Sequence, residues 1–239
     1  MLRLILTIFF CITGVANVYG GTTVVVPDTM AERVRACTIC HSAEDKAGRD
    51  AYYPRIAGKP QGYLFNQLRN FRDGRRYYQP MATLLENMSD EYLLEIARYF
   101  SSLQLPYPEP ERIRMLPEEI KMAKRLIYSG NPDKDIPPCS ACHGDALMGV
   151  EPVIPALLGL SRAYIAAQLS GWRKGSIMRS QTPDCMSEIA KQLSDDEANV
   201  IAKWLASQPV TGESRPFSAL LPELAHRCSQ IIPVNGGMQ

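Results

Sequence analysis

The sequence predicts an all-α protein with two similar domains in tandem. Apolar residues recur at helical spacing in several segments, and no segment alternates apolar and polar residues as a strand would. The same set of motifs also occurs in both halves of the chain. The 239 residues, of which 46% are hydrophobic and 21% charged, are enough for two modest domains.

The composition excludes several classes of protein. The 26 Lys and Arg residues and the 25 Asp and Glu residues give a net charge of only +1. Such a balance provides no basic surface for a phosphate backbone, so we expect no nucleic-acid partner. Intrinsic disorder and collagen-like structure are also excluded by composition.

The internal repeat begins with a five-residue motif. Cys37-Thr38-Ile39-Cys40-His41 recurs as Cys139-Ser140-Ala141-Cys142-His143, at an offset of 102 residues. Matching positions then follow at a constant offset of 101 in the two halves: Pro54, Gly58, Tyr63, Gln67, Leu68, Phe71, Arg72 and Gly74 against Pro155, Gly159, Tyr164, Gln168, Leu169, Trp172, Arg173 and Gly175. The chain is therefore a tandem duplication.

A pair of methionines extends the repeat. Met81 stands eight residues before Ser89, and Met186 stands eight residues before Ser194, now at an offset of 105. The second half therefore carries a four-residue insertion ahead of its methionine. Each Met precedes a capped helix, so we expect a loop to present its side chain.

Helices are predicted at equivalent places in the two halves. Ser89 and Ser194 are N-cap residues, and Ser194 with Glu197 forms a capping-box pattern. Pro117 at a first helical position and Gly130 just past the end bracket a further helix. The predicted helices cover residues 63–72, 90–103, 118–129, 164–173 and 195–207.

The domain boundaries follow from the repeat and from proline content. We predict a signal peptide over residues 1–20, an N-terminal domain over 21–105, a Pro-rich linker over 106–116, a C-terminal domain over 117–208 and an irregular tail over 209–239. Pro106, Pro108, Pro110 and Pro117 favour an extended connector.

The N-terminal segment is typical of an exported protein. Arg3 precedes an apolar run over residues 4–16 that is shorter than the ~20 residues a membrane-spanning helix needs. We expect cleavage near Gly20, with Ala16 as a competing site and an uncleaved anchor as the alternative. Export implies an oxidising periplasmic destination, and membrane association stays open.

The two Cys-x-x-Cys-His motifs predict covalent attachment of haem c. The thiols of Cys37 and Cys40, and those of Cys139 and Cys142, would form thioethers with the porphyrin vinyl groups. His41 and His143 would then be the proximal iron ligands. A zinc site needs four ligands where each motif offers three, and a dithiol redox pair needs no His, so both are weaker interpretations.

The remaining site residues also come in pairs. Met81 and Met186 are the candidate sixth ligands, although a single Met is more often core filler. The carbonyls of Pro54 and Pro155 are candidate acceptors for the second nitrogen of each His. The alternative is that each proline simply forms a turn. The aromatic residues expected to wall the haem pockets are Tyr63, Tyr164, Phe71 and Trp172.

These motifs resemble the dihaem class I c-type cytochromes called cytochrome c(4), over about residues 31–208. The resemblance implies two class I cytochrome c domains, each wrapped around one covalent haem, in an exported and often membrane-associated protein. Implied partners are a quinol:cytochrome c oxidoreductase, a terminal oxidase or a dehydrogenase. Ser42 departs from the family, which usually has Gly after the His, as at Gly144, and the tail is longer than the family's.

Other residues allow alternatives. Cys185 either forms a disulfide with Cys228, stays free, or ligates the second iron. The basic run Arg69, Arg72, Arg75 and Arg76 is interpreted as a solvated helix end, with a docking patch or a screen for haem propionates as the alternative, and His226 as a surface residue.

Three classes of function remain. The first is an electron carrier and not an enzyme. The second is the haem subunit of a larger enzyme such as a sulfide dehydrogenase. The third is a catalytic dihaem peroxidase or thiosulfate-oxidising enzyme, for which neither half offers a spare His.

Overall fold

The described part of the chain is helical. The computed structural model describes residues 27–41, 52–175, 185–211 and 216, and both the leader predicted over residues 1–20 and Cys228 lie outside them. Within these residues the only β-type pairings are two isolated bridges, at Asn131–Ile136 and Val150–Ile154. The all-α prediction is confirmed.

Among the described residues, the first half contains five helices: α1 (Met30–Arg33), α2 (Arg35–His41), α3 (Gln61–Arg72), α4 (Gln79–Leu85) and α5 (Asp90–Ser102). Helix α3 packs against both α5 and α4. Residues 63–72 and 90–103 were predicted as helices, and α3 and α5 match them with ends that differ by one or two residues.

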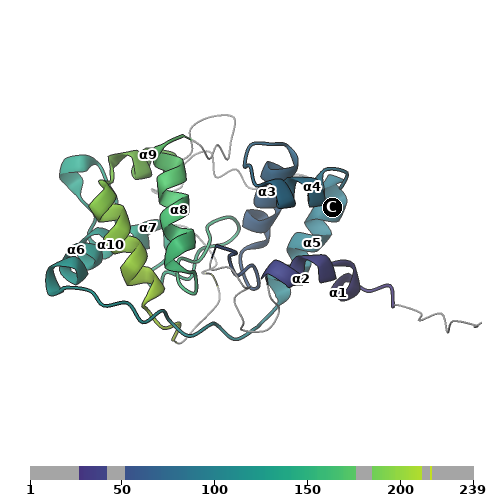
Figure 1. Cartoon of the computed structure of the whole chain (residues 1–239), viewed down its shortest axis with the longest axis horizontal. Helices are drawn as coiled ribbons and strands as arrows, with labels where there is room; N and C mark the ends of the chain where they lie inside the picture. Colours follow the sequence, from purple (N-terminus) through teal and green to yellow (C-terminus); the bar gives the residue numbers. More distant parts are fainter. Residues whose placement is uncertain (1–26, 42–51, 176–184, 212–215, 217–239) are drawn as a thin grey trace, which may run out of the picture.

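The second half repeats this plan with one helix added before its Cys motif. Its elements are α6 (Pro117–Tyr128), the 3-10 helix η1 (Pro132–Lys134), α7 (Cys139–His143), α8 (Arg162–Arg173), α9 (Cys185–Gln192) and α10 (Asp195–Ala206). Helix α10 packs on α6 and α8, and α9 packs on α8. The two groups of helices lie side by side (Figure 1).

Each half has its own hydrophobic core. The apolar faces predicted for α5 and α10 are buried: Leu93, Ile96, Ala97 and Phe100 in the first half, and Val200, Ile201, Trp204 and Leu205 in the second. These residues meet α3 and α6 in two separate clusters, and burial of such side chains supplies most of the folding free energy. Helical periodicity therefore predicted the inward faces correctly.

Side-chain caps start these two helices. The Ser89 hydroxyl accepts a hydrogen bond from the backbone N–H of Tyr92, and the Ser194 hydroxyl accepts one from Glu197. Glu197 in turn accepts from the backbone N–H of Ser194 at 2.8 Å, which completes the capping box.

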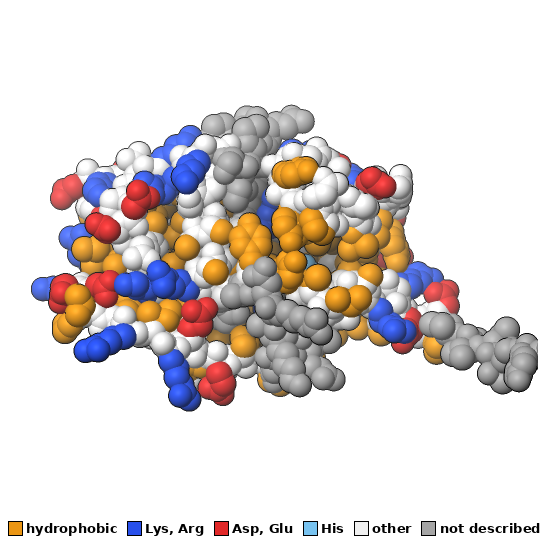
Figure 2. Space-filling model, in the orientation of Figure 1, with side chains coloured by type: hydrophobic (Ala, Val, Ile, Leu, Met, Phe, Trp, Pro, Cys, Tyr) orange, Lys and Arg blue, Asp and Glu red, His pale blue; other side chains and the backbone are white. Residues whose placement is uncertain are grey.

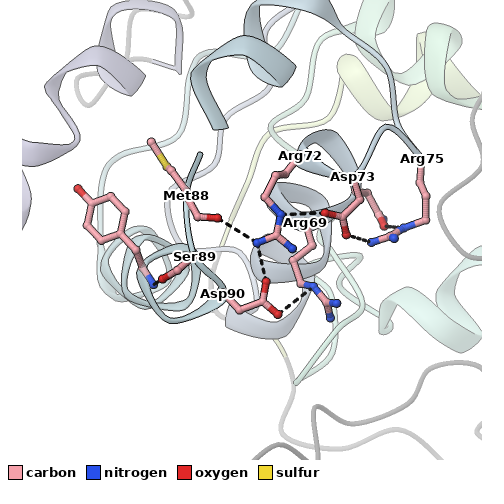
Figure 3. Close-up of polar contacts among 9 residues, drawn as sticks. Arg69, Arg72, Asp73, Arg75, Met88, Ser89 and Asp90 are labelled. Atoms are coloured by element: carbon pink, nitrogen blue, oxygen red, sulfur yellow. Dashed lines mark hydrogen bonds and ion pairs between the residues drawn. The ribbon is translucent and has the colours of Figure 1, made fainter. Parts of the chain in front are cut away.

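A repeated ion pair joins the end of one helix to the start of the next. Arg72 at the end of α3 contacts Asp90 at the start of α5, with Nη1 and Oδ1 2.6 Å apart (Figure 3). Arg173 and Asp195 form the same pair between α8 and α10. Arg72 also donates to the carbonyl oxygen of Met88 at 3.0 Å, so it holds the turn that follows α4.

The connector between α5 and α6 contains no helix, and it packs on both halves. Arg55 of the first half donates to the carbonyl oxygen of Pro106 at 2.7 Å and stacks over the ring of Tyr107. On the other side, the backbone N–H of Glu111 donates to the carbonyl oxygen of Ala206 at 2.8 Å. The connector runs along one edge of the paired helix groups (Figure 1).

Candidate cofactor sites

One short helix in each half carries two thiols and an imidazole. Helix α2 bears Cys37, Cys40 and His41, and the five-residue helix α7 bears Cys139 and the rest of the second motif. Residues three and four apart in a helix share a face, so the first Cys, the second Cys and the His of each motif lie within one turn. This arrangement offers two sulfur atoms and one nitrogen to a single flat ligand.

A backbone carbonyl orients each imidazole. The Nδ1 atom of His41 lies 2.8 Å from the carbonyl oxygen of Pro54, and that of His143 lies 2.8 Å from the carbonyl oxygen of Pro155. A carbonyl can only accept, so Nδ1 carries the proton in both rings and Nε2 keeps its lone pair. The predicted role of the two prolines as acceptors is confirmed.

Burial keeps these groups neutral. Burial lowers the pKa of His41 and of His143, although the bond to each proline carbonyl opposes the shift. Burial also raises the pKa of the Cys37 thiol, and it raises that of Cys139 to about 12. A neutral imidazole is the form that binds a metal. A cysteine binds a metal as the thiolate, so thiols held in the neutral form are poorly suited as metal ligands.

The two repeated methionines lie on short helices. Met81 is on α4 and packs against the first core, while Met186 is on α9 and packs against the second. The sequence predicted loops at these places, so that prediction was wrong. Helix α4 has a proline in its first turn, where proline is well tolerated. The prediction of a loop considered only the spacing from each Met to the capping serine and overlooked this helix-start signal. Met148, predicted as packing, is 2% exposed.

The predicted pocket aromatics are buried or partly buried, and all but Tyr164 belong to the two cores or their margins. Phe71 and Tyr164 are buried, and Tyr63 and Trp172 are partly buried against the two clusters. They lie on α3 and α8, the helices that carry the repeated pattern.

Cys185, directly before Met186, is disulfide-bonded. Its sulfur is therefore not a free ligand for iron. The predicted partner Cys228 lies outside the described residues.

The basic run at the C-terminal end of α3 divides into two parts. Arg72 and Arg75 form ion pairs with Asp73, and Arg69 pairs with Asp90 (Figure 3). Arg76, by contrast, is only 8% exposed. The prediction of a solvated helix end is therefore wrong for Arg76.

Arg76 points into the contact between the two halves. Its guanidinium donates to the Tyr164 hydroxyl and to Gln168 Oε1, both at 3.1 Å, and to Gln67 Oε1 at 2.9 Å. It also stacks over the Phe71 ring. All four of these partners are uncharged, and two of them belong to α8.

Lys59 crosses the same contact. Its ammonium is buried and donates to the carbonyl oxygen of Ala156, in the second half, at 3.4 Å. Nearby, the backbone N–H of Tyr63 donates to the carbonyl oxygen of Pro152 at 3.3 Å. On the face drawn in Figure 2, apolar side chains gather where the two halves meet.

The donor set fits haem c better than a bare metal ion. Each half combines two buried or half-buried thiols with an imidazole whose Nε2 is available, and with aromatic side chains packed on the adjacent core. These features, present twice in an all-α fold, define a dihaem c-type cytochrome as the class of protein.

Comparisons with known proteins agree. No protein-family model matches the chain. It is 37% identical over 180 residues to the thiosulfate dehydrogenase electron acceptor of Thiomonas intermedia, covering 74% of this chain and 80% of that protein. It is 28% identical over 197 residues to cytochrome c4 of Pseudomonas aeruginosa, covering 81% and 92% of the two chains.

Solved structures give the same result. Reduced cytochrome c4 from Pseudomonas stutzeri superimposes with a TM-score of 0.64 and 26% identity, over 74% of this chain and 96% of that one. Thiosulfate dehydrogenase from Marichromatium purpuratum matches with a TM-score of 0.61 and 27% identity, over 73% of this chain and 36% of that one.

The chain belongs to the cytochrome c4 family. It consists of two tandem class I cytochrome c domains, and it carries two covalently bound haem c groups. Within the residues that the structure describes, no helix is long and apolar enough to span a bilayer.

Proposed function

We propose that this dihaem cytochrome carries single electrons between periplasmic redox proteins, through two haems that are each ligated by His and Met. The observation that carries the proposal is the duplicated contact between each imidazole and a proline carbonyl, which leaves Nε2 of His41 and of His143 available to a metal. The family is one of electron-transfer proteins.

The proposed attachment residues are Cys37 and Cys40 in the first half, and Cys139 and Cys142 in the second. All four side chains are half-buried, and burial raises the pKa of the Cys37 and Cys139 thiols, which suits an apolar thioether bond to a porphyrin. His41 and His143 are the proposed proximal ligands, because the backbone fixes the orientation of both rings.

The proposed distal ligands are Met81 and Met186. They hold matching places in the repeat, and each lies at the margin of the core that would enclose its haem. A bound haem with His and Met ligands supplies a one-electron iron couple at high potential. The chain's own part is to hold the ligands, exclude water from the irons and leave no coordination position for a substrate.

A second candidate is narrower: electron acceptor of a thiosulfate dehydrogenase. The relative from Thiomonas intermedia, at 37% identity, bears that name. A purified thiosulfate dehydrogenase with thiosulfate should then reduce this cytochrome, whereas thiosulfate alone should not. Reduction by a quinol:cytochrome c oxidoreductase and none by the dehydrogenase would favour a respiratory carrier.

Export to the periplasm is part of the proposal. The mature chain should begin close to residue 21, and the mass of the purified protein should equal that chain plus two haems. Intact-protein mass spectrometry measures both, and a mature chain with fewer than two added haems would reject the function.

The ligand assignment is tested with Met81→Ala and Met186→Ala, made separately in the holoprotein. Each change should leave both haems attached, lower the potential of one haem and admit cyanide to it. Met148→Ala is the matched control, since that side chain lies in the second core and has no place in the repeat. Retention of the native potentials in the first two variants would overturn the assignment.

A further inference from the structure

We propose that the buried ammonium of Lys59, which belongs to the first half, raises the reduction potential of the haem in the second half. The inference rests on the proposed function and deepens it, because it names a residue that makes the two haems inequivalent. Lys59 would not ligate the iron. It would act on the second haem through the positive charge that it places near the proximal side of that site.

The geometry brings Lys59 next to the proximal ligand of the other half. Its side chain is buried, with the residue 6% exposed, and Nζ lies 3.4 Å from the carbonyl oxygen of Ala156. Ala156 directly follows Pro155, whose carbonyl oxygen accepts from Nδ1 of His143 at 2.8 Å. The ammonium and the imidazole are thus bonded to two consecutive carbonyl groups.

Among the residues that the structure describes, no carboxylate pairs with the Lys59 ammonium, because none of their ion pairs includes Lys59. Burial lowers its pKa to about 8, so the ammonium is still mostly protonated at pH 7.

A positive charge at this place favours the reduced haem for two reasons. Oxidised iron carries one more positive charge than reduced iron, and repulsion between charges is strong where water is excluded. A cation near His143 also disfavours negative charge on the ring, and a less basic proximal ligand stabilises the oxidised iron less. Both effects raise the potential.

This lysine occurs at one site only, because the repeat is broken at this residue. Gly58 and Gly159 hold matching turns, with φ of 71° and 70°. The residue that follows is Lys59 in the first half but Leu160 in the second. The first haem therefore has no equivalent lysine reaching across from the second half.

The test is a redox titration of the full-length holoprotein at pH 7, followed by absorption spectroscopy. Met186→Ala identifies which one-electron step belongs to the second haem. Lys59→Gln should lower the potential of that step and shift the potential of the other step less. Lys59→Arg, which keeps the charge, should hold the potential of the second haem near the wild-type value. Lys124→Gln, at an exposed lysine of α6, is the matched control and should move neither step.

The outcomes separate this inference from the proposed function. A wild-type protein that takes up fewer than two electrons per chain would reject the function. Two steps of which neither moves in Lys59→Gln, or an equal shift of both, would overturn the role of Lys59. Haem content and circular dichroism check folding, and Lys59→Met, which removes the charge but keeps an apolar chain of similar length, replaces Lys59→Gln if that variant does not fold.

Discussion

The Nδ1 atom of His143 lies 2.8 Å from the carbonyl oxygen of Pro155, and the first half repeats the contact between His41 and Pro54. Proline has a fixed φ, so the chain bearing this carbonyl cannot rotate away from the ring as readily as an unrestrained chain could. The bond also protects the Nδ1 proton from exchange with water.

Replacement of Pro155 by Gly should therefore speed exchange of the His143 Nδ1 proton. The freed backbone would open the bond more often, by roughly fivefold for about 1 kcal/mol. Hydrogen exchange followed by NMR of the reduced protein measures the rate. Pro54→Gly is the reciprocal control: each variant should affect its own half, and equal acceleration at both histidines would contradict the local role.

Gly149 should be intolerant of a side chain, because it packs against the loop that holds Pro155. A Cβ atom there would lie 2.5 Å from the carbonyl oxygen of Ile154 and 2.8 Å from the carbonyl carbon of Pro155. Gly149 also has φ of 89°, which L residues rarely adopt.

Gly175 separates these two costs, since it too has a positive φ but has nothing within 4 Å of its Cβ position. Gly175→Ala should cost about 1 kcal/mol of unfolding free energy from backbone strain alone. Gly149→Ala should cost clearly more. Chemical denaturation of the holoprotein measures both losses of unfolding free energy. Equal losses would mean that the loop around Pro155 can shift to accommodate the added Cβ atom without destabilising the fold.

Arg76 should stabilise the contact between the halves. In Arg76→Met, the Gln168 amide and the Tyr164 hydroxyl would lose a buried donor, at a cost of about 1–3 kcal/mol in unfolding free energy. Arg98→Met, at an exposed position of α5, should change it by less than about 0.5 kcal/mol. A similar small change in both variants would show that Arg76 is dispensable for stability.

The sequence predicted what repeats and what is local. The capped starts of α5 and α10 and the apolar faces of both helices follow from serine caps and helical spacing. The proline carbonyls could be predicted because the same spacing from Cys to Pro recurs, within one residue, in both halves. The same contact, from the proline carbonyl to the His ring, therefore forms in both halves.

The sequence could not predict what crosses between the halves. Arg76 sits in a run of arginines whose other members are half-buried and pair with Asp73 or Asp90, and nothing in the local sequence separates it from them. Lys59 occupies a turn whose counterpart is Leu160, so the repeat indicated no role for it. Both become significant only when α8 and the turn at Ala156 are placed against the first half.

The Glu197 carboxylate should make the stability of the second half sensitive to acid. This side chain accepts from the Ser194 backbone N–H and from Lys134 Nζ, at 2.8 and 2.9 Å. Burial alone would raise the pKa of Glu197, but these bonds outweigh it and hold the pKa below the ordinary value of 4.5. A carboxyl with a lowered pKa stabilises the fold above its ordinary pKa, and this contribution is lost as the pH falls through the folded value.

Glu197→Gln should therefore reduce the unfolding free energy at pH 7 by about 1 kcal/mol, typical of a lost cap. The difference from wild type should shrink as the pH falls below 4.5, because the wild-type carboxyl is then protonated as well. Urea titrations at a series of pH values measure this. Glu188→Gln, at an exposed residue of α9, should show little difference at any pH. A constant gap between Glu197→Gln and wild type down to about pH 3 would mean that the charge of Glu197 contributes nothing.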